Sequence, residues 1–219
     1  MENKTIVVIP AKDEEKHIEE VIKKTKKYVK NIVVIDDGSK DKTSEIAKKA
    51  GAIVLKHSIN LGKGNALKTG CEFAIKEKYE TIIFMDSDGQ HDPHDIPRFL
   101  NELKKVDIVF GSRKLNKNMP FIFRFGNWFI NTVSKILFRV NISDTQSGFR
   151  AFKSNIYNKI KWHADGYTVE SEIIANVGKF NLKYKEINIE TIYNDSYKGT
   201  TVMDGVIIVK DMFYIKLLR

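Results

Sequence analysis

The stretch TIIFMDSDGQHDP, residues 81–93, joins a short apolar run to three aspartates that fall within seven residues. The apolar run is rich in isoleucine and nearly continuous, which is typical of a strand covered on both faces of its sheet. Asp86 and Asp88 follow the run directly, and Asp92 stands before Pro93, a residue favoured at the first position of a helix. The stretch therefore indicates one unit of an α/β sheet, with carboxylates where the strand ends and Asp92 as the cap of the next helix.

Similar apolar runs recur through the first half of the chain, at residues 5–10, 31–37, 52–56 and 107–112. Segments with helical spacing of apolar residues separate them, and we expect helices at residues 18–29, 41–51, 63–79 and 93–104. The alternation predicts an α/β fold with a Rossmann-like, mostly parallel open sheet and helices on both faces. In the second half we expect helices near residues 121–139 and 169–178 and a strand within residues 182–193. We expect this half to share the sheet of the first half and to cover the edge where the first strands end.

The composition is that of a soluble globular protein made of one domain, with 42% hydrophobic residues and a formal net charge of +9. The positive charge favours an anionic partner, which could be nucleic acid, a membrane surface or a phosphorylated substrate. A single cysteine, Cys71, allows no intramolecular disulfide and favours a reducing, cytoplasmic setting. The N-terminal apolar run is too short for a signal peptide, and charged or polar residues interrupt every stretch long enough to span a membrane.

Acidic residues follow the ends of three predicted strands, at Glu14, Asp36, Asp37, Asp86 and Asp88. The carboxyl ends of parallel strands meet at one edge of a sheet, so we expect these carboxylates to lie together and to need a cation. A divalent ion held by one or two carboxylates and completed by substrate phosphates is the usual arrangement for Mg²⁺. Asp86 and Asp88 are the best candidates, because residues two apart on an extended backbone point to the same side. The alternative is that residues 86–89 form only a polar turn, which is the more common meaning of an isolated D-x-D pattern.

A second polar loop, NLGKGNALKTG at residues 60–70, precedes a predicted helix. Its backbone amides around Gly64 and the side chain of Lys63 would suit a phosphate at the start of that helix. The loop lacks the spacing of a P-loop, and no G-x-G-x-x-G motif follows the first strand. A nucleoside triphosphatase or a dinucleotide-binding enzyme is therefore disfavoured.

Six short motifs follow one another in the order IPAKDEE, IDDGSKDKT, NLGKGNAL, MDSDGQHDP, GSR and DTQSGFRAF, between residues 9 and 152. In this order they resemble glycosyltransferase family 2, and within it the synthases that attach a sugar to dolichyl or polyprenyl phosphate. The resemblance implies a GT-A fold, a nucleotide-sugar donor, a divalent metal ion (Mg²⁺ or Mn²⁺) and a lipid monophosphate acceptor. A fainter echo of the family lies in NDSYKGTT, residues 194–201.

Carried onto this chain, the resemblance assigns contacts with the nucleoside to Pro10, Ala11, Glu14 and Asp37. It assigns the metal and the diphosphate to Asp86 and Asp88, with Gln90 close to the metal. Ser87, between the two aspartates in the sequence, belongs to the expected nucleotide-sugar site. Lys63 belongs to the same expected donor site, and Lys198 is expected to close over the diphosphate, although an ordinary surface lysine is its alternative. The motif PAKDE departs from the family's usual P-x-Y-N-E pattern, which weakens any inference about which nucleotide base is bound.

Arginines are the expected ligands of the acceptor phosphate, because a guanidinium binds phosphate oxygens through paired donors. The resemblance points to Arg113 and Arg124, and Arg150 is a third candidate that could instead brace its own loop. A serine often found one turn after the second arginine is Trp128 here. A phosphate monoester, with a second pKa of about 6, needs no general base to attack the donor sugar, so we expect one in-line displacement with inversion.

Three other readings remain at this point. A saccharide hydroxyl could be the acceptor, with Asp144 or Glu170 as the general base. The protein could be a basic nucleic-acid-binding module, although its lysines are spread over many predicted helices and no nucleic-acid motif is present. It could also bind a nucleotide sugar without turning it over. For the lipid-phosphate sugar synthase that the motifs resemble, the donor stays open among GDP-mannose, UDP-glucose and UDP-N-acetylglucosamine.

The segment 121–139 combines aromatic and basic residues at helical spacing, which is typical of a helix that lies in a membrane interface. The same stripe could equally be part of the core. The C-terminal segment 204–219 is a second candidate. We therefore expect a nucleotide-sugar-binding half at about residues 1–112, an acceptor-binding half at about 113–201 and an amphipathic helix at about 202–219, in an enzyme on the cytoplasmic face of a membrane or bound to a membrane-protein partner.

Overall fold

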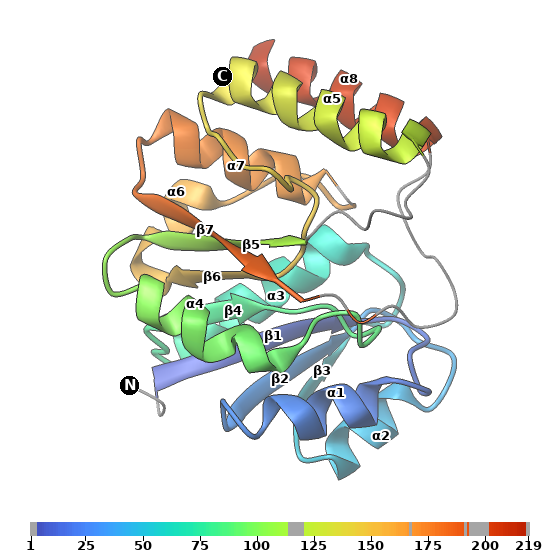
Figure 1. The fold of residues 1–219 in the computed structure, drawn as a ribbon. Coiled ribbons are helices and arrows are strands. Elements are labelled where there is room, and N and C mark those ends of the chain that lie inside the picture. The colour runs from blue at the N-terminus through green and yellow to red at the C-terminus, as the bar shows by residue number, and fades with distance from the viewer. Residues whose placement is uncertain (1–3, 114–120, 167, 191, 193–201, 218–219) are drawn as a thin grey trace.

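A computed structural model describes residues 4–113, 121–166, 168–190, 192 and 202–217. Its strands form one sheet in the order β3-β2-β1-β4-β6-β5-β7, which joins the two halves of the chain (Figure 1). The strands are β1 (Thr5–Ala11), β2 (Asn31–Asp36), β3 (Ile53–Lys56), β4 (Thr81–Phe84), β5 (Ile108–Arg113), β6 (Arg150–Lys153) and β7 (Tyr184–Ile189). The prediction of a mostly parallel α/β sheet is confirmed, since every described strand except β6 runs in the same direction.

Helices cover both faces of the sheet, as the nearly continuous apolar strands require. The helices are α1 (Ile18–Thr25), α2 (Thr43–Lys49), α3 (Lys63–Lys76), α4 (Ile96–Glu102), α5 (Phe121–Phe138), α6 (Tyr157–Ile160), α7 (Val169–Lys179) and α8 (Val202–Leu217). In β1, Val7 and Ile9 pack with the cluster that includes α1, α2 and α4, whereas Ile6 and Val8 pack with the cluster that includes α3, α6 and α7. Alternate residues of one strand thus anchor opposite layers.

Two details differ from the expected elements. The helix predicted at 93–104 begins as a short 3₁₀ turn, Pro93–Asp95, before α4, and Asp92 caps it by accepting a hydrogen bond from the amide of His94. Strand β6 was not expected. It runs antiparallel between β4 and β5 and carries the end of the DTQSGFRAF motif into the middle of the sheet.

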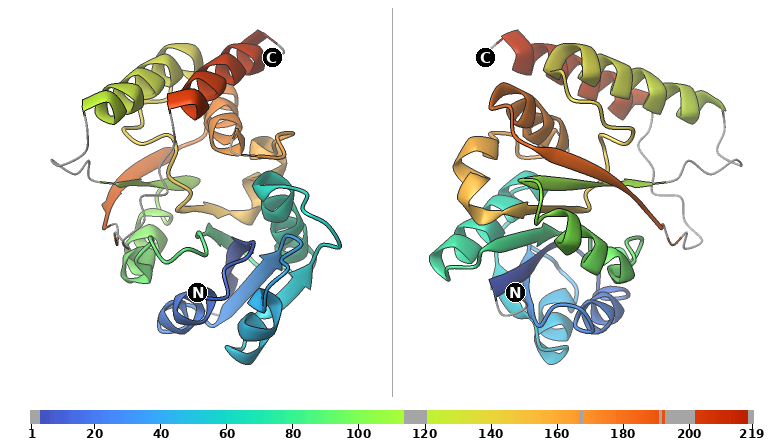
Figure 2. Two further views of the ribbon diagram at one scale, coloured as in Figure 1. Left: turned by 90° about the vertical axis from the view of Figure 1, so that its right-hand side faces the viewer. Right: turned by 60° about the vertical axis from the view of Figure 1, so that its left-hand side comes forward.

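Helices α5 and α8 lie side by side in an outer layer beyond α7 (Figures 1 and 2). Among the described side chains of α5, Ile130, Val133 and Phe138 are buried, while Trp128, Phe129 and Ile136 are exposed. One face of this helix is therefore part of the core, while the role of the exposed face at a membrane interface stays a prediction. No helix within the described ranges is long and apolar enough to cross a membrane.

Candidate active site

The carboxyl ends of β1, β2, β4 and β5 lie along one edge of the sheet, because these strands run in the same direction. That edge carries the residues that follow β2 and β4, including Asp37 and Asp86, and the last residue of β5, Arg113. A polar site at this edge is what an open α/β sheet provides.

Asp86 is the acid of this edge whose pKa is shifted most strongly. Its Oδ1 lies 2.9 Å from Nζ of Lys63, and its backbone amide donates to Nδ1 of His91 over 3.2 Å. Burial opposes ionisation, but the charge and the hydrogen bond of Lys63, together with other nearby cationic groups, outweigh burial and hold the pKa of Asp86 far below its ordinary value. Arg113 contributes to the same lowering. The carboxylate is therefore ionised at any physiological pH.

The loop after β4 folds back on itself around this carboxylate. Burial lowers the pKa of His91, so its neutral ring can accept the amide hydrogen of Asp86. Oδ1 of Asp88 accepts the amide of Gln90 over 3.0 Å, and the carbonyl of Gln90 accepts the amide of Ile192. Ser87, between the two aspartates, is buried. The predicted D-x-D segment is thus both a polar turn and a place where two carboxylates meet the sheet edge.

Gly148, from the DTQSGFRAF motif, lies directly against Asp86. A Cβ at Gly148 would stand 2.7 Å from Oδ2 and 2.9 Å from Oδ1 of that carboxylate. A side chain at this position would force the carboxylate or the loop to move, so glycine lets the loop before β6 approach the acid. This explains a glycine that the motif alone left without a physical reason.

Lys63 bridges two acids at the start of α3. Its Nζ lies 2.9 Å from Asp86 and 3.1 Å from Oε1 of Glu170, at the start of α7. Although burial disfavours its charge, the two carboxylates raise the pKa of Lys63 well above its ordinary value. The other oxygen of Glu170, Oε2, is buried and has no hydrogen-bond partner among the described residues.

The backbone amides of this second loop do not have the role expected of them. The amides of Leu61 and Gly62 donate to the carboxylate of Asp37, and the amide of Gly64 donates to the carbonyl of Asp165. The expectation of exposed amides is therefore wrong for Leu61, Gly62 and Gly64, because each already has an acceptor within the protein. The side chain of Lys63 contacts Asp86 from this loop.

Two of the five carboxylates expected to repel one another already have partners within the protein. Asp36 is buried and accepts hydrogen bonds from Ser39 and Ser44, with Lys56 3.3 Å away, and these interactions overcome burial and lower its pKa. Asp37 is engaged by the amides named above and by His57. Repulsion among five acids therefore does not demand a cation, and any metal requirement falls on Asp86 and Asp88.

The residues expected at the nucleoside lie at the end of β1 and just beyond it. Pro10 and Ala11 pair with Ile35 and Asp36 of β2, and the amide of Glu14 donates to the hydroxyl of Thr43. The same two loops are laced together by further bonds, from Asp13 to Ser39, from Lys40 to Asp13, from Glu15 to Asp41 and from Lys42 to Glu15. The IPAKDEE and IDDGSKDKT motifs thus build one rigid frame beside the strand ends.

The donor set at Asp86 and Asp88 fits a divalent ion that takes most of its ligands from a substrate. Within the described ranges no cluster of three or more His, Cys, Asp and Glu side chains could enclose a metal alone. Magnesium ions in phosphate-transfer sites commonly use one or two carboxylates and the substrate's phosphates. Oε2 of Glu170, which is buried and has no hydrogen-bond partner among the described residues, is a further polar group beside Lys63.

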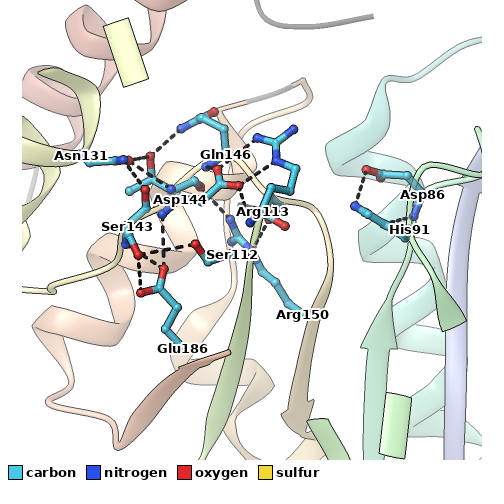
Figure 3. A network of polar contacts seen from close by, with 12 residues as sticks. Asp86, His91, Ser112, Arg113, Asn131, Ser143, Asp144, Gln146, Arg150 and Glu186 are labelled. Carbon is cyan, nitrogen blue, oxygen red and sulfur yellow. Dashed lines mark hydrogen bonds and ion pairs between the residues drawn. The ribbon is translucent and has the colours of Figure 1, made fainter. Parts of the chain in front are cut away.

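Arg113, the last residue of β5, is held by Asp144. The Nε of Arg113 donates to Oδ2 over 2.7 Å, Nη2 donates to Oδ1 over 3.0 Å, and the backbone amide of Arg113 also donates to Oδ2 (Figure 3). Burial would raise the pKa of Asp144, but the guanidinium and these hydrogen bonds hold it below its ordinary value. The pair fixes a partly exposed arginine at the same edge as Asp86.

Arg150 has a different environment. It is 2% exposed, and its Nε, Nη1 and Nη2 donate to the carbonyls of Ser147, Glu170 and Thr145. Its guanidinium also lies over the ring of Phe110. These are the contacts of a brace that ties the DTQSGF loop to α7, which was one of the two roles expected of it.

Two expected site residues cannot be placed in this geometry. Lys198 lies outside the described residues, and Arg124 belongs to a stretch of α5 whose side chains are not described. Sequence reasoning also missed residues that the geometry makes prominent: His91, Gly148, Asn131 and Glu186. The first two stand inside recognised motifs, whereas Asn131 and Glu186 carry no sequence signal, because their partners are distant along the chain.

Comparison with known proteins agrees with this geometry. The family model described as Glycosyl transferase family 2 matches residues 6–167. An uncharacterised protein of Methanocaldococcus jannaschii is 44% identical over 210 residues, which are 91% of this chain and 86% of the relative. The UDP-N-acetylglucosamine–dolichyl-phosphate N-acetylglucosaminyltransferase of Methanococcus voltae is 31% identical over 239 residues, 96% of this chain and 95% of the relative.

Among solved structures, glucosyl-3-phosphoglycerate synthase from Mycobacterium tuberculosis, in complex with Mg²⁺ and uridine diphosphate, superposes with a TM-score of 0.75. The two sequences are 19% identical, and the match covers 98% of this chain and 78% of the other, so this likeness concerns the fold. The family match extends over most of the chain, and it includes every motif from the first strand end to DTQSGFRAF. The chain belongs to glycosyltransferase family 2 and has the GT-A fold of that family.

Proposed function

We propose that this enzyme transfers a hexose from a nucleotide sugar to the phosphate of a dolichyl or polyprenyl lipid, with inversion at the anomeric carbon. The observation that carries the proposal is the Arg113–Asp144 pair. It presents a guanidinium at the edge where Asp86 lies, and it engages the carboxylate that a hydroxyl acceptor would need as a base. The likeness to a transferase that acts on dolichyl phosphate supports the same acceptor.

Asp144 is a poor general base in this setting. Its oxygens accept hydrogen bonds from the side chain and the amide of Arg113 and from the amide of Gln146. A base needs a pKa near the working pH, whereas the pKa of Asp144 is lowered. Glu170, the other candidate, is buried against Lys63. Attack by an already ionised lipid phosphate removes the need for either residue.

On the donor side, Asp86 and Asp88 would hold Mg²⁺ or Mn²⁺, with Gln90 nearby. Such an ion, when bound, supplies positive charge to the diphosphate that leaves. Lys63 adds a second positive charge beside Asp86, and Lys198 is proposed to approach the same diphosphate. Pro10, Ala11, Glu14, Asp37 and Ser87 complete the proposed nucleotide-sugar site, in which Asp37 acts by holding the loop before α3.

On the acceptor side, Arg113 and Arg124 are proposed to bind the lipid phosphate. Arg150 is assigned to the brace, because each of its three guanidinium nitrogens already donates to a carbonyl. UDP-N-acetylglucosamine is the first donor to test, because it stands in the name of the Methanococcus voltae relative, of which the match covers 95%. UDP-glucose and GDP-mannose are the alternatives.

We further propose that the enzyme works at the cytoplasmic surface of a membrane, with residues up to about 112 binding the donor and later residues the acceptor. The exposed apolar side chains of α5 and α8 support this placement: Trp128, Phe129, Ile136, Ile207, Phe213, Tyr214 and Leu217. Exposed basic residues accompany them at Lys135, Arg139, Lys210 and Lys216. A surface of this kind suits an anionic lipid interface.

The test incubates the enzyme with Mn²⁺ or Mg²⁺, each nucleotide sugar in turn, and three acceptors: polyprenyl phosphate, the unphosphorylated polyprenol and a free disaccharide. Lipid and sugar products are identified by mass. A product from the phosphate alone supports the proposal. A product from the disaccharide, with none from the lipid phosphate, would assign the enzyme to a saccharide hydroxyl acceptor. Chelation should abolish turnover, as should the joint change Asp86→Asn and Asp88→Asn.

A further inference from the structure

The loop that contains Asp144 is held from two sides. On the α5 side, Asn131 donates from Nδ2 to the carbonyl of Ser143, and its Oδ1 accepts the amide of Thr145 over 3.2 Å and the Thr145 hydroxyl over 2.9 Å. On the β7 side, Glu186 accepts the amide of Ser143 over 2.7 Å and its hydroxyl over 2.6 Å. The loop is thus clamped between an outer helix and the sheet (Figure 3).

This clamp determines where the carboxylate of Asp144 stands. Residues on both sides of it, Ser143 and Thr145, are fixed by the bonds of Asn131, and Glu186 also accepts the amide of Asp144 itself. The carboxylate then fixes Arg113 through the side chain and the backbone. A continuous chain of hydrogen bonds therefore runs from a side chain of α5 to the guanidinium at the sheet edge.

We infer that Asn131 is a positioning residue for Arg113, acting through the loop 143–145 and Asp144. The inference rests on the proposed function, in which Arg113 binds the acceptor phosphate. Its consequence is that the phosphate-binding arginine keeps a fixed position relative to α5, whose outer face carries Trp128 and Ile136 exposed. Helix α5 would then set both the depth of the lipid phosphate below a bilayer surface and the position of Arg113, which binds that phosphate.

A purely structural role for Asn131 would not need this geometry. The side-chain amide of Asn131 bonds to the backbone and to a hydroxyl of the loop, while Ile130, Val133 and Phe138 supply the buried apolar face of α5. The adjacent Thr132 offers a matched contrast, because its hydroxyl donates to the carbonyl of Trp128 within α5 itself. Removing the polar group of Thr132 leaves the path to Arg113 intact.

The experiment compares Asn131→Ala, Glu186→Ala and Thr132→Val with the unmodified enzyme. For each, KM for polyprenyl phosphate, kcat and the Kd of the nucleoside diphosphate with Mn²⁺ are measured, together with the thermal midpoint. Asn131→Ala should raise KM for the lipid phosphate by about threefold to tenfold, the scale of one or two lost hydrogen bonds, and leave the nucleotide Kd unchanged. Glu186→Ala, which approaches the loop from another element, should do the same even if Asn131→Ala loosens α5. Thr132→Val should change neither KM for polyprenyl phosphate nor the nucleotide Kd.

A double-mutant cycle with Arg113→Ala separates this inference from the proposed function. If Asn131 acts through Arg113, adding Asn131→Ala to Arg113→Ala raises KM no further. Should Arg113→Ala itself leave KM for the lipid phosphate unchanged, the proposed acceptor site is wrong. Should Arg113→Ala raise KM while Asn131→Ala and Glu186→Ala do not, or while their effects add fully to it, only the positioning role is overturned.

Discussion

Nζ of Lys63 lies 2.9 Å from Oδ1 of Asp86, so the carboxylate that we assign to the metal already has a cationic partner within the protein. A divalent ion and Lys63 therefore draw on the same negative charge. In the family mechanism that we propose, both serve the donor diphosphate, but they oppose each other when no nucleotide is bound.

Replacing Lys63 by Met should separate these two effects. Without nucleotide, Mn²⁺ should bind the variant more tightly than the unmodified enzyme, because the charge of Asp86 is no longer neutralised. With nucleotide sugar, affinity should fall, because a cation of the donor site is lost. Two carboxylates left without their lysine should also cost about 1–3 kcal/mol in the free energy of unfolding. Calorimetric titration and urea unfolding measure these quantities.

The control is Lys76→Met, at the exposed end of the same helix α3, which should change neither Mn²⁺ affinity nor nucleotide affinity. Adding Glu170→Gln to Lys63→Met should recover part of the lost stability, since it removes the second uncompensated carboxylate. Weaker Mn²⁺ binding by Lys63→Met in the absence of nucleotide would contradict the assignment of the metal to Asp86.

Gly148→Ala tests the contact between the loop before β6 and Asp86, which we propose to be a ligand of the metal. The new Cβ would stand 2.7 Å from Asp86 Oδ2, so either the acid or the loop must move. We expect the affinity for nucleotide with Mn²⁺ to fall roughly tenfold or more, because displacement of a ligating group by a fraction of an ångström is costly at such a site. Gly126→Ala is the control, since a Cβ there meets no atom of the described residues within 4 Å. Unchanged binding by Gly148→Ala would mean that Asp86 is not a donor-site ligand.

The strands and the edge at which they end could be predicted because their signals are local. Continuous apolar runs such as residues 5–10 and 81–85 are typical of a buried parallel sheet, and the direction of such a sheet places their carboxyl ends together. The cap at Asp92 was likewise a matter of adjacent residues and is confirmed.

Partnerships between distant residues could not be predicted in the same way. Arg113 and Asp144 are 31 positions apart, and nothing in either neighbourhood shows that they pair. The sequence does not show that Asp36 and Asp37 are engaged, because the hydroxyl groups and loop amides that bind them come into contact only in the folded chain. For the same reason the amides of the NLGKGNAL loop were misjudged: each is satisfied by a carbonyl or carboxylate from elsewhere.

Arg150→Met should affect stability more than chemistry at the acceptor. The side chain is buried and donates to carbonyls at Thr145, Ser147 and Glu170, which would all lose a charged donor. We expect a loss of roughly 3 kcal/mol in urea unfolding. Arg113→Ala, at a partly exposed ion pair, should cost about 1 kcal/mol or less and yet abolish most transfer to lipid phosphate. The opposite ranking in stability would reverse the roles assigned to the two arginines.

The Arg113–Asp144 pair also predicts a dependence of stability on pH. The pKa of Asp144 is lower in the folded protein than in the unfolded chain, where it is about 3.9, so the folded state favours the ionised form. Its contribution to stability is therefore complete above the unfolded pKa and is lost as pH falls through the folded pKa. The difference in unfolding free energy between the unmodified enzyme and Asp144→Asn should be constant between about pH 5 and pH 8 and shrink below about pH 4. A difference that grows as pH falls would have the wrong sign.

The outer face of α5 and α8 supplies the last prediction, which concerns the membrane. Ile136 is 72% exposed and Phe213 is 51% exposed, on helices that lie side by side and carry basic residues. Changing either to Glu should weaken binding to vesicles that contain phosphatidylglycerol about tenfold, the scale of one large apolar side chain removed from lipid. Ile59→Glu is the matched control, because Ile59 is 67% exposed but belongs to the loop before α3. Flotation at low and at physiological salt measures the binding, which salt should reduce, since part of the attraction is electrostatic. Equal binding by all three variants would show that this face does not meet the lipid, and the acceptor would then have to be delivered by another route.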